Sequence, residues 1–255
     1  MQLLDKNYII ANTQEKKYTL EIFESIDSTN TYLRKMSAAK YPRFCLAEQQ
    51  TLGQGRFGRS WYSPFGQNIY LSALYLCPKN GYALAGLSLI IALAIIKVLQ
   101  KYLPANKIKA KWPNDVIVTN KKIAGAIVES KSIAPELSSV IIGIGLNVNM
   151  VTTSIDSWTS IHSIRKNYVN RNEVCVLLIN FLLEYLKRFI ASGVANFIQE
   201  WHKVDYLLAK KITINNANIN YTGIAKGIDE FGRLLIELSD GIIKPFVSGD
   251  TTIGS

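Results

Sequence analysis

The sequence has little cysteine and histidine. Its three cysteines, Cys45, Cys77 and Cys175, lie far apart, and its two histidines, His162 and His202, are isolated. No CxxC pair occurs. This pattern argues against a disulfide framework and against a zinc site, and it is typical of proteins in a reducing cytoplasm. We therefore expect a cytoplasmic protein.

Long hydrophobic runs are also lacking. The longest, residues 83–96, contains Gly86 and Ser88 and ends at Lys97. A membrane-spanning helix needs about 20 apolar residues, so this run predicts a buried helix. The N-terminal residues lack the basic region and apolar stretch of a secretory signal.

Runs of four or more consecutive basic residues are absent, although the net charge is +10. From Leu208 onward, five basic residues balance five acidic ones, so the excess lies within residues 1–207. Such a spread favours a diffuse positive surface around an anion-binding cleft over an arm that reads DNA.

Periodicity and turn residues predict an α+β fold with two domains. Residues 1–207 form a mixed α/β domain and residues 208–255 a small all-β domain, because short strand runs there alternate with turns such as Ser239-Asp240-Gly241. The predicted strands are 18–23, 44–50, 68–75, 107–112, 116–119, 123–130, 140–149, 211–214, 221–228, 233–238 and 242–247. The predicted helices are 31–39, 83–102, 172–192 and 194–201.

Residues 53–61, Gly-Gln-Gly-Arg-Phe-Gly-Arg-Ser-Trp, are the densest chemical signal. Glycine lets the backbone curve around a ligand, and arginine matches phosphate and carboxylate oxygens. Alone, the stretch reads equally well as a solvated surface loop. It lacks the Gly-Lys-Ser/Thr ending of a P-loop.

A second signal is Lys111-Trp112-Pro113-Asn114-Asp115, which sets a cation beside a turn with a carboxylate four residues on. Taken alone, it also fits a strand end with a buried tryptophan and a solvated lysine.

Together these residues resemble the biotin protein ligases, which join biotin to a lysine of a carrier domain. The resemblance covers about residues 20 to 250 in the family's order. It rests on Ser28-Thr29-Asn30, Glu48-Gln49-Gln50, residues 53–59 with Trp61, Lys111 to Asp115, Lys122 to Gly125, Gly143 to Asn149, and Gly241 to Pro245.

The resemblance implies a mixed-sheet catalytic domain of the biotin/lipoate ligase, class II synthetase-like type, flanked by helices, with a C-terminal SH3-like β-barrel. It implies that ATP and biotin form biotinyl-5'-AMP before transfer to the lysine. Magnesium is expected to shield the ATP phosphates, although its ligands are unknown.

The resemblance also implies roles for individual residues. The predicted catalytic residues are Lys111, Arg56, Arg59 and Asp115, where Asp115 orients Lys111 or the metal. The predicted biotin-binding residues are Ser28, Thr29, Asn30, Gln50, Gly53, Gln54, Arg56, Lys111, Gly125, Gly143 and Gly145. The predicted ATP-binding residues are Arg56, Arg59, Trp61, Asn114, Lys122, Asn147 and Trp158, with Trp158 as a lid over adenine.

Two departures from the family stand out. Many members carry Gly-Arg-Gly-Arg-x-Gly-Arg in the loop, where this chain has Gln54, which supplies no charge. Only about 24 residues precede Ser25, too few for the helix-turn-helix domain that makes some relatives repressors. We expect a short form that does not bind DNA.

The expected partner is the biotin carboxyl carrier domain of a carboxylase, and the expected state is a monomer or weak homodimer away from membranes. The rival interpretations are a lipoate or octanoate ligase of the same superfamily and a non-catalytic biotin-binding regulator. The Gly/Arg loop together with Lys111 to Asp115 favours biotin.

Overall fold

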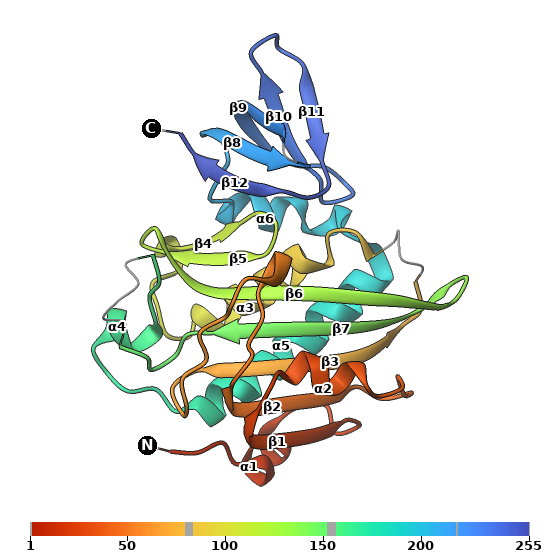
Figure 1. Ribbon diagram of the computed structural model, residues 1–255, viewed down its shortest axis with the longest axis vertical. Helices are drawn as coiled ribbons and strands as arrows, with labels where there is room; N and C mark the ends of the chain where they lie inside the picture. The colour runs from red at the N-terminus through yellow and green to blue at the C-terminus, as the bar shows by residue number, and fades with distance from the viewer. Residues whose placement is uncertain (1, 80–83, 152–156, 218, 255) are drawn as a thin grey trace.

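The protein contains two β-sheets, seen in a computed structural model that describes residues 2–79, 84–151, 157–217 and 219–254 (Figure 1). The larger sheet has the order β1-β2-β3-β7-β6-β5-β4, with β1 parallel to β2 and the other pairs antiparallel. Its strands are β1 (Thr19–Ile26), β2 (Arg43–Gln50), β3 (Ile69–Cys77), β4 (Ile108–Lys111), β5 (Asp115–Val118), β6 (Lys121–Ala134) and β7 (Leu137–Leu146).

The smaller sheet is C-terminal and antiparallel, with the order β11-β10-β9-β8-β12. Its strands are β8 (Lys211–Asn216), β9 (Ile219–Ile228), β10 (Leu234–Leu238), β11 (Ile243–Phe246) and β12 (Asp250–Ile253). It stands beside β4, β5 and helix α6 (Ile198–Val204) at one end of the molecule (Figure 1). The predicted α+β class and the small C-terminal β unit are confirmed. The boundary at residues 207 and 208 remains our proposal, and it falls between α6 and β8.

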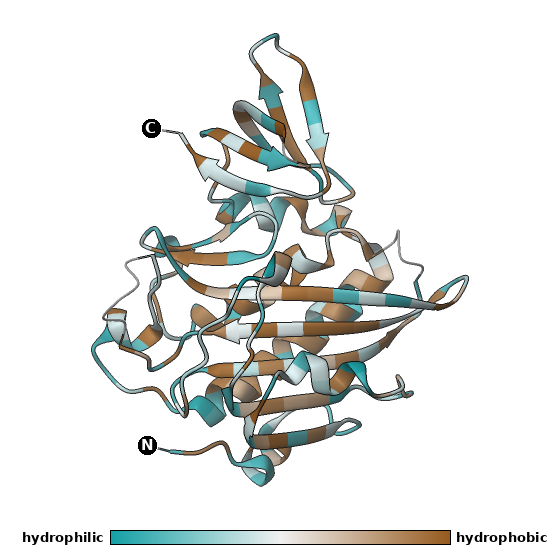
Figure 2. Cartoon of the chain, in the orientation of Figure 1, coloured by the Kyte–Doolittle hydropathy of each residue, from teal (hydrophilic) through white to brown (hydrophobic). Residues whose placement is uncertain are grey.

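The two faces of the larger sheet differ because strand side chains alternate. One face is apolar, carries residues such as Leu71, Ile142 and Ile144, and forms the main core with helices α3 (Leu87–Leu99) and α5 (Arg171–Ser192). Helix α3 is buried along most of its length. The central strands are mostly hydrophobic (Figure 2).

The opposite face is covered only in part, by helix α2 (Thr29–Arg34). Leu33 of α2 packs there on Cys45, Leu74 and Ile141. The rest of this face carries small residues, among them Ser72, and remains open to a cavity. We call it the site face.

Several predicted bounds differ from the structure. The helix predicted over 31–39 is α2, which begins earlier because the Ser28 side chain caps it. The helix predicted over 83–102 is the shorter α3, and residue 83 lies outside the described residues. The helix predicted over 194–201 divides into a 3₁₀ turn, Ala195–Phe197, and α6. The strand predicted to reach Asn149 ends at Leu146.

Two α-helices and one strand among the described residues were not predicted. They are helix α1 (Lys6–Asn12), helix α4 (Ile161–Arg165) and strand β12. The helices are short, and only Ile9 of α1 and Ile161 of α4 are buried, so neither shows a repeating apolar pattern. Strand β12 is mostly polar and is defined by its pairing with β8.

Candidate functional site

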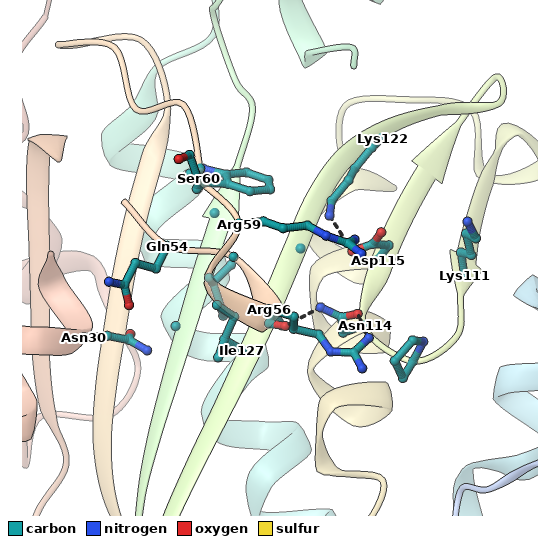
Figure 3. A pocket seen from close by; sticks show the side chains of 18 of the residues that line it. Asn30, Gln54, Arg56, Arg59, Ser60, Lys111, Asn114, Asp115, Lys122 and Ile127 are labelled. Carbon is teal, nitrogen blue, oxygen red and sulfur yellow. Dashed lines mark hydrogen bonds and ion pairs between the residues drawn. The ribbon is translucent and has the colours of Figure 1, made fainter. Parts of the chain in front are cut away.

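A cavity of about 550 Å³ lies on the site face. Helix α2, residues 53–61, the turn after β4 and the start of β12 surround it. It brings together most of the residues predicted from the sequence: Ser28, Thr29, Asn30, Gln50, Gln54, Arg56, Arg59, Trp61, Lys111, Asn114, Asp115, Lys122, Gly125, Gly143, Gly145 and Trp158. Figure 3 shows Asn30 and Gln54 on one side, Lys111 and Asp115 on the other, and Arg56 between them.

The floor of the cavity is made of glycines on β6 and β7. Gly125 pairs with Gly145, and Gly143 lies opposite Ser72 of β3. A Cβ atom on Gly143 would come within 2.4 Å of Asn30, and one on Gly145 within 2.4 Å of the Trp61 ring. Glycine is therefore required here so that those side chains can lie directly on the sheet.

The side of the cavity next to α2 is lined by uncharged, hydrogen-bonded side chains, among them Thr29 and Gln50. We call it the ring side, because we expect the ring of biotin to bind there. Both the backbone N–H and the hydroxyl of Thr29 donate to Gln50 Oε1, at 2.9 and 3.0 Å. Gln50 Nε2 donates to Ser63 Oγ at 3.3 Å. Ser28 and Thr29 are buried, so these groups are held in place before any ligand arrives.

The opposite side collects cations; we call it the cationic side. Asn114 fixes Arg56, since Arg56 donates to its Oδ1 at 3.2 Å while its Nδ2 donates to the Ala126 carbonyl at 2.7 Å. Burial is the main factor that lowers the pKa of Arg56 and of Lys111. Among the described residues, no carboxylate lies within 4 Å of the charged nitrogens of these two cations.

Two other cations on this side already have partners. Lys122 Nζ lies 2.6 Å from Asp115 Oδ1, and Arg59 pairs with Asp250 of β12. Asp115 was predicted to orient Lys111 or a metal; in the structure it contacts Lys122, while the backbones of Lys111 and Asp115 are paired across β4 and β5. The smaller sheet thus reaches the cavity through Asp250.

The loop 53–61 is a folded turn. The backbones of Gln54 and Ser60 form an isolated antiparallel β-bridge, and the Gly55 N–H donates to the Arg59 carbonyl. Phe57 and Gly58 at the tip have φ angles of 55° and 72°. Phe57 is 70% exposed and does not line the cavity.

Trp61 and Trp158 stack on each other with ring centroids 5.4 Å apart. Lys122 Nζ lies 5.3 Å from the centroid of the Trp61 ring. The two tryptophans come from segments far apart in sequence and both line the cavity, with Trp61 lying on Gly145. This aromatic wall suits a flat heterocycle.

Two predicted site residues do not line the cavity. Gly53 serves the loop itself, since a Cβ there would come within 2.6 Å of the Trp61 carbonyl. Asn147 is 0% exposed, and its Nδ2 donates to the Thr159 carbonyl at 3.0 Å. Its predicted contact with adenine stays a prediction.

Comparisons with known proteins show the family to which this chain belongs. Residues 22–147 match the Biotin/lipoate A/B protein ligase family, and residues 210–251 match the Biotin protein ligase C terminal domain. The Biotin--[acetyl-CoA-carboxylase] ligase of Paracoccus denitrificans is 30% identical over 82% of this chain and 90% of its own length. The chain belongs to the biotin protein ligase family.

Two further relatives define the extent of the likeness. The Bifunctional ligase/repressor BirA of Escherichia coli strain K12 is 35% identical over all of this chain and 79% of its own length. The biotin protein ligase from Aquifex aeolicus, solved in complex with biotin and ATP, is 27% identical with a TM-score of 0.78. That match covers 92% of this chain and 98% of the other.

Sequence reasoning about this biotin protein ligase family member missed several cavity residues. They include Ser60, Ser72, Glu129, Asp250 and Thr251. Ser72 left one signal, because it is a hydroxyl inside the otherwise apolar run of β3. Asp250 left none, since no local pattern joins β12 to the loop.

The described residues contain no group of three or more His, Cys, Asp or Glu side chains that could hold a metal ion. No helix in the described part of the chain is long and apolar enough to cross a membrane.

Proposed function

We propose that this chain activates biotin with ATP to form biotinyl-5'-AMP and then transfers biotin to a lysine of a biotin carboxyl carrier domain. One observation carries the proposal: a single cavity joins a neutral hydrogen-bonding side to a cationic side where Lys111 and Arg56 lack carboxylate partners among the described residues. Desolvated cations of this kind are stabilised when an anionic ligand arrives.

In the first reaction, a biotin carboxylate oxygen attacks the α-phosphorus of ATP and pyrophosphate leaves with the bonding electrons. Both reactants are anions, so the barrier is largely electrostatic. We assign Lys111 to the carboxylate and α-phosphate, and Arg56 and Arg59 to the phosphates. Asp115 then acts on Lys122, whose ammonium it holds at 2.6 Å.

In the second reaction, the neutral amine of the acceptor lysine attacks the acyl carbon and AMP leaves. Water competes with that amine, so the adenylate has to be covered. The loop 53–61 is the segment placed to do this, because Gln54, Arg56 and Arg59 all line the cavity. We propose that Trp61 and Trp158 receive adenine between or beside their rings.

Magnesium fits this site only together with ATP. The cavity carboxylates Asp115 and Asp250 each form an ion pair, and no protein cage for a metal is present among the described residues. Mg²⁺ usually keeps several waters and binds one or two carboxylates plus substrate phosphates. We propose that it enters on ATP and that Asp115 or Asp250, the carboxylates on the cationic side, would supply its protein oxygen donor.

The remaining assignments are also proposals. We expect the positive surface to attract an acidic carrier domain, so the rate of transfer should fall as salt rises. We further expect a cytoplasmic monomer or weak homodimer. A gel shift with duplex DNA at several salt concentrations checks the expectation that the chain does not bind DNA.

The experiment that tests the function is incubation with ATP and either biotin, lipoate or octanoate, with the acyl-adenylate detected directly. We expect biotinyl-5'-AMP alone. Activity with lipoate or octanoate but not biotin would assign the chain to the rival ligases. Binding of biotin without adenylate would favour a regulator.

A further inference from the structure

A continuous chain of hydrogen bonds runs behind the ring side of the cavity, from the surface of α2 to the loop. Arg34 donates to both carboxylate oxygens of Glu129 at 3.0 Å each, and Asn30 Nδ2 donates to Glu129 Oε1 at 2.9 Å. Ser72 Oγ lies 2.5 Å from Asn30 Oδ1 and 2.7 Å from Thr29 Oγ1. Thr29 continues the chain to Gln50.

At the Glu129 end of this hydrogen-bond network, the donors and the acceptor are fixed. Burial acts to raise the pKa of Glu129, but hydrogen bonds from Arg34 and Asn30 outweigh it, so the pKa lies below its usual value. The carboxylate is therefore ionised near neutral pH and only accepts hydrogen bonds. The amide edge of Asn30 that faces it must be the NH₂ group, which turns Asn30 Oδ1 toward Ser72 and the cavity.

The Gln50 end is fixed as well. The backbone N–H of Thr29 donates to Gln50 Oε1, so that atom is the amide oxygen, and the Thr29 hydroxyl must donate to it too. Ser72 then has one proton for two acceptors, Asn30 Oδ1 and Thr29 Oγ1. One acceptor on the cavity side is always left over.

We propose that Glu129, held by Arg34, is a positioning residue that sets the Asn30 carbonyl toward the cavity, so that the ring side selects ligands with N–H donors. The inference rests on the proposed function. The cyclic urea of biotin brings two N–H groups, one of which meets the surplus acceptor. A dithiolane ring or an octanoyl chain brings none and would leave that acceptor unpaired.

The test compares Glu129→Ala with a matched control, Glu21→Ala. Glu21 also holds α2 through a carboxylate, by accepting from the Tyr32 hydroxyl, but it does not line the cavity. Calorimetry measures the affinity of the full chain for biotin and for octanoate, and adenylation assays give kcat and the KM for ATP. Thermal melting confirms that each variant is folded.

We expect Glu129→Ala to weaken biotin binding about tenfold, the loss typical of an oriented hydrogen bond near a charge. Octanoate affinity, kcat and the KM for ATP should stay within about twofold, because we assign Asn30 to the ring of biotin and not to ATP or the acyl chain. Glu21→Ala, which removes the acceptor of the Tyr32 hydroxyl, should change none of these values. Glu129→Gln keeps an acceptor oxygen for Asn30 and should restore part of the affinity.

Three results would overturn the inference. They are unchanged biotin affinity in folded Glu129→Ala, an equal loss for biotin and octanoate, and an equal loss in Glu21→Ala. A wild-type chain that binds biotin but makes no adenylate would contradict the proposed function instead. The binding comparison would still decide the role of Glu129 in that case.

Discussion

The two sides of the cavity are prepared for ligands in different ways. On the ring side, Thr29 and Gln50 already bond to each other, so the protein fixes their orientation. On the cationic side, Lys111 and Arg56 are desolvated without a carboxylate partner among the described residues. One side is organised by the fold, whereas the other is completed by the charge of its ligand.

This contrast predicts which measured quantity each substitution changes. Ring-side changes should alter biotin affinity, because those hydrogen bonds are the same in the ground state and the transition state. Cationic-side changes should alter turnover, because negative charge moves onto the phosphates only during reaction. The following predictions test that division.

The largest effect is expected for Lys111→Ala. Loss of one preorganised cation should lower the rate of adenylate formation about 10²- to 10³-fold, while calorimetric binding of biotin in the absence of ATP changes much less. Lys109→Ala is the control, because Lys109 lies on the same strand, bonds the Lys203 carbonyl and does not line the cavity. Near-normal turnover in Lys111→Ala would remove this residue from catalysis.

Next in size is the difference between Gly143→Ala and Gly125→Ala. The added methyl at residue 143 would overlap Asn30, so biotin affinity should fall at least tenfold. At residue 125 the nearest atom, 3.2 Å away, belongs to the Lys122 side chain, which is able to move. Biotin affinity there should stay within about threefold. Equal losses in the two variants would contradict the division of the cavity.

The pH dependence should also come from the cationic side. Burial lowers the pKa of Lys111, against the opposing effect of Asp115, and only the charged form binds anions. Turnover should therefore fall as pH rises through this lowered pKa, approaching about tenfold per pH unit. Lys111→Arg, where active, should move the decline to higher pH.

Protein stability should respond in the opposite direction. Between the lowered pKa of Lys111 and the value of about 10.4 for an unfolded lysine, the unfolded chain binds more protons. The contribution of Lys111 to the free energy of unfolding thus rises with pH across that interval. Denaturant melts of wild type and Lys111→Met, compared at several pH values, measure this contribution.

The smallest effect is expected for Asp250→Asn. In the wild type, Arg59 has to break its ion pair with Asp250 of β12 before it can bind ATP. The substitution removes that ion pair, so the KM for ATP should fall about two- to threefold. The pair is exposed, and the gain should shrink in high salt. A rise in the KM would mean that Asp250 holds Arg59 in its working position.

Most of the fold could be predicted because it follows from local patterns. Helix α5 and strands β2 and β3 each carry apolar residues at regular spacing, and their predicted bounds differ from the structure by only a few residues. Helix α1 could not be found this way. Its stability depends on the cap from the neighbouring Asp5 and on packing against the distant helix α5. Neither contact produces a repeating apolar pattern in the sequence.

The candidate site was predictable where the family resemblance supplied it and not where three-dimensional contacts did. Lys111 and Arg56 stood out by their neighbours in sequence. Glu129 and Asp250 did not, because their partners are far away in sequence. Glu129 lies 95 residues from Arg34, and Asp250 lies 191 residues from Arg59. The residues next to a charged side chain on a strand do not indicate which distant residue it will pair with.

The glycine floor has a consequence for protein engineering. Variants that accept bulkier biotin analogues are usually sought by trimming a side chain that blocks the ligand. Beneath this cavity Gly125, Gly143 and Gly145 leave only main chain, which offers nothing to trim. New space must be made at the side chains around the glycines, for example at Ile127 opposite Gly143 or at Gln54 of the loop, because any side chain at Gly143 or Gly145 would only remove space.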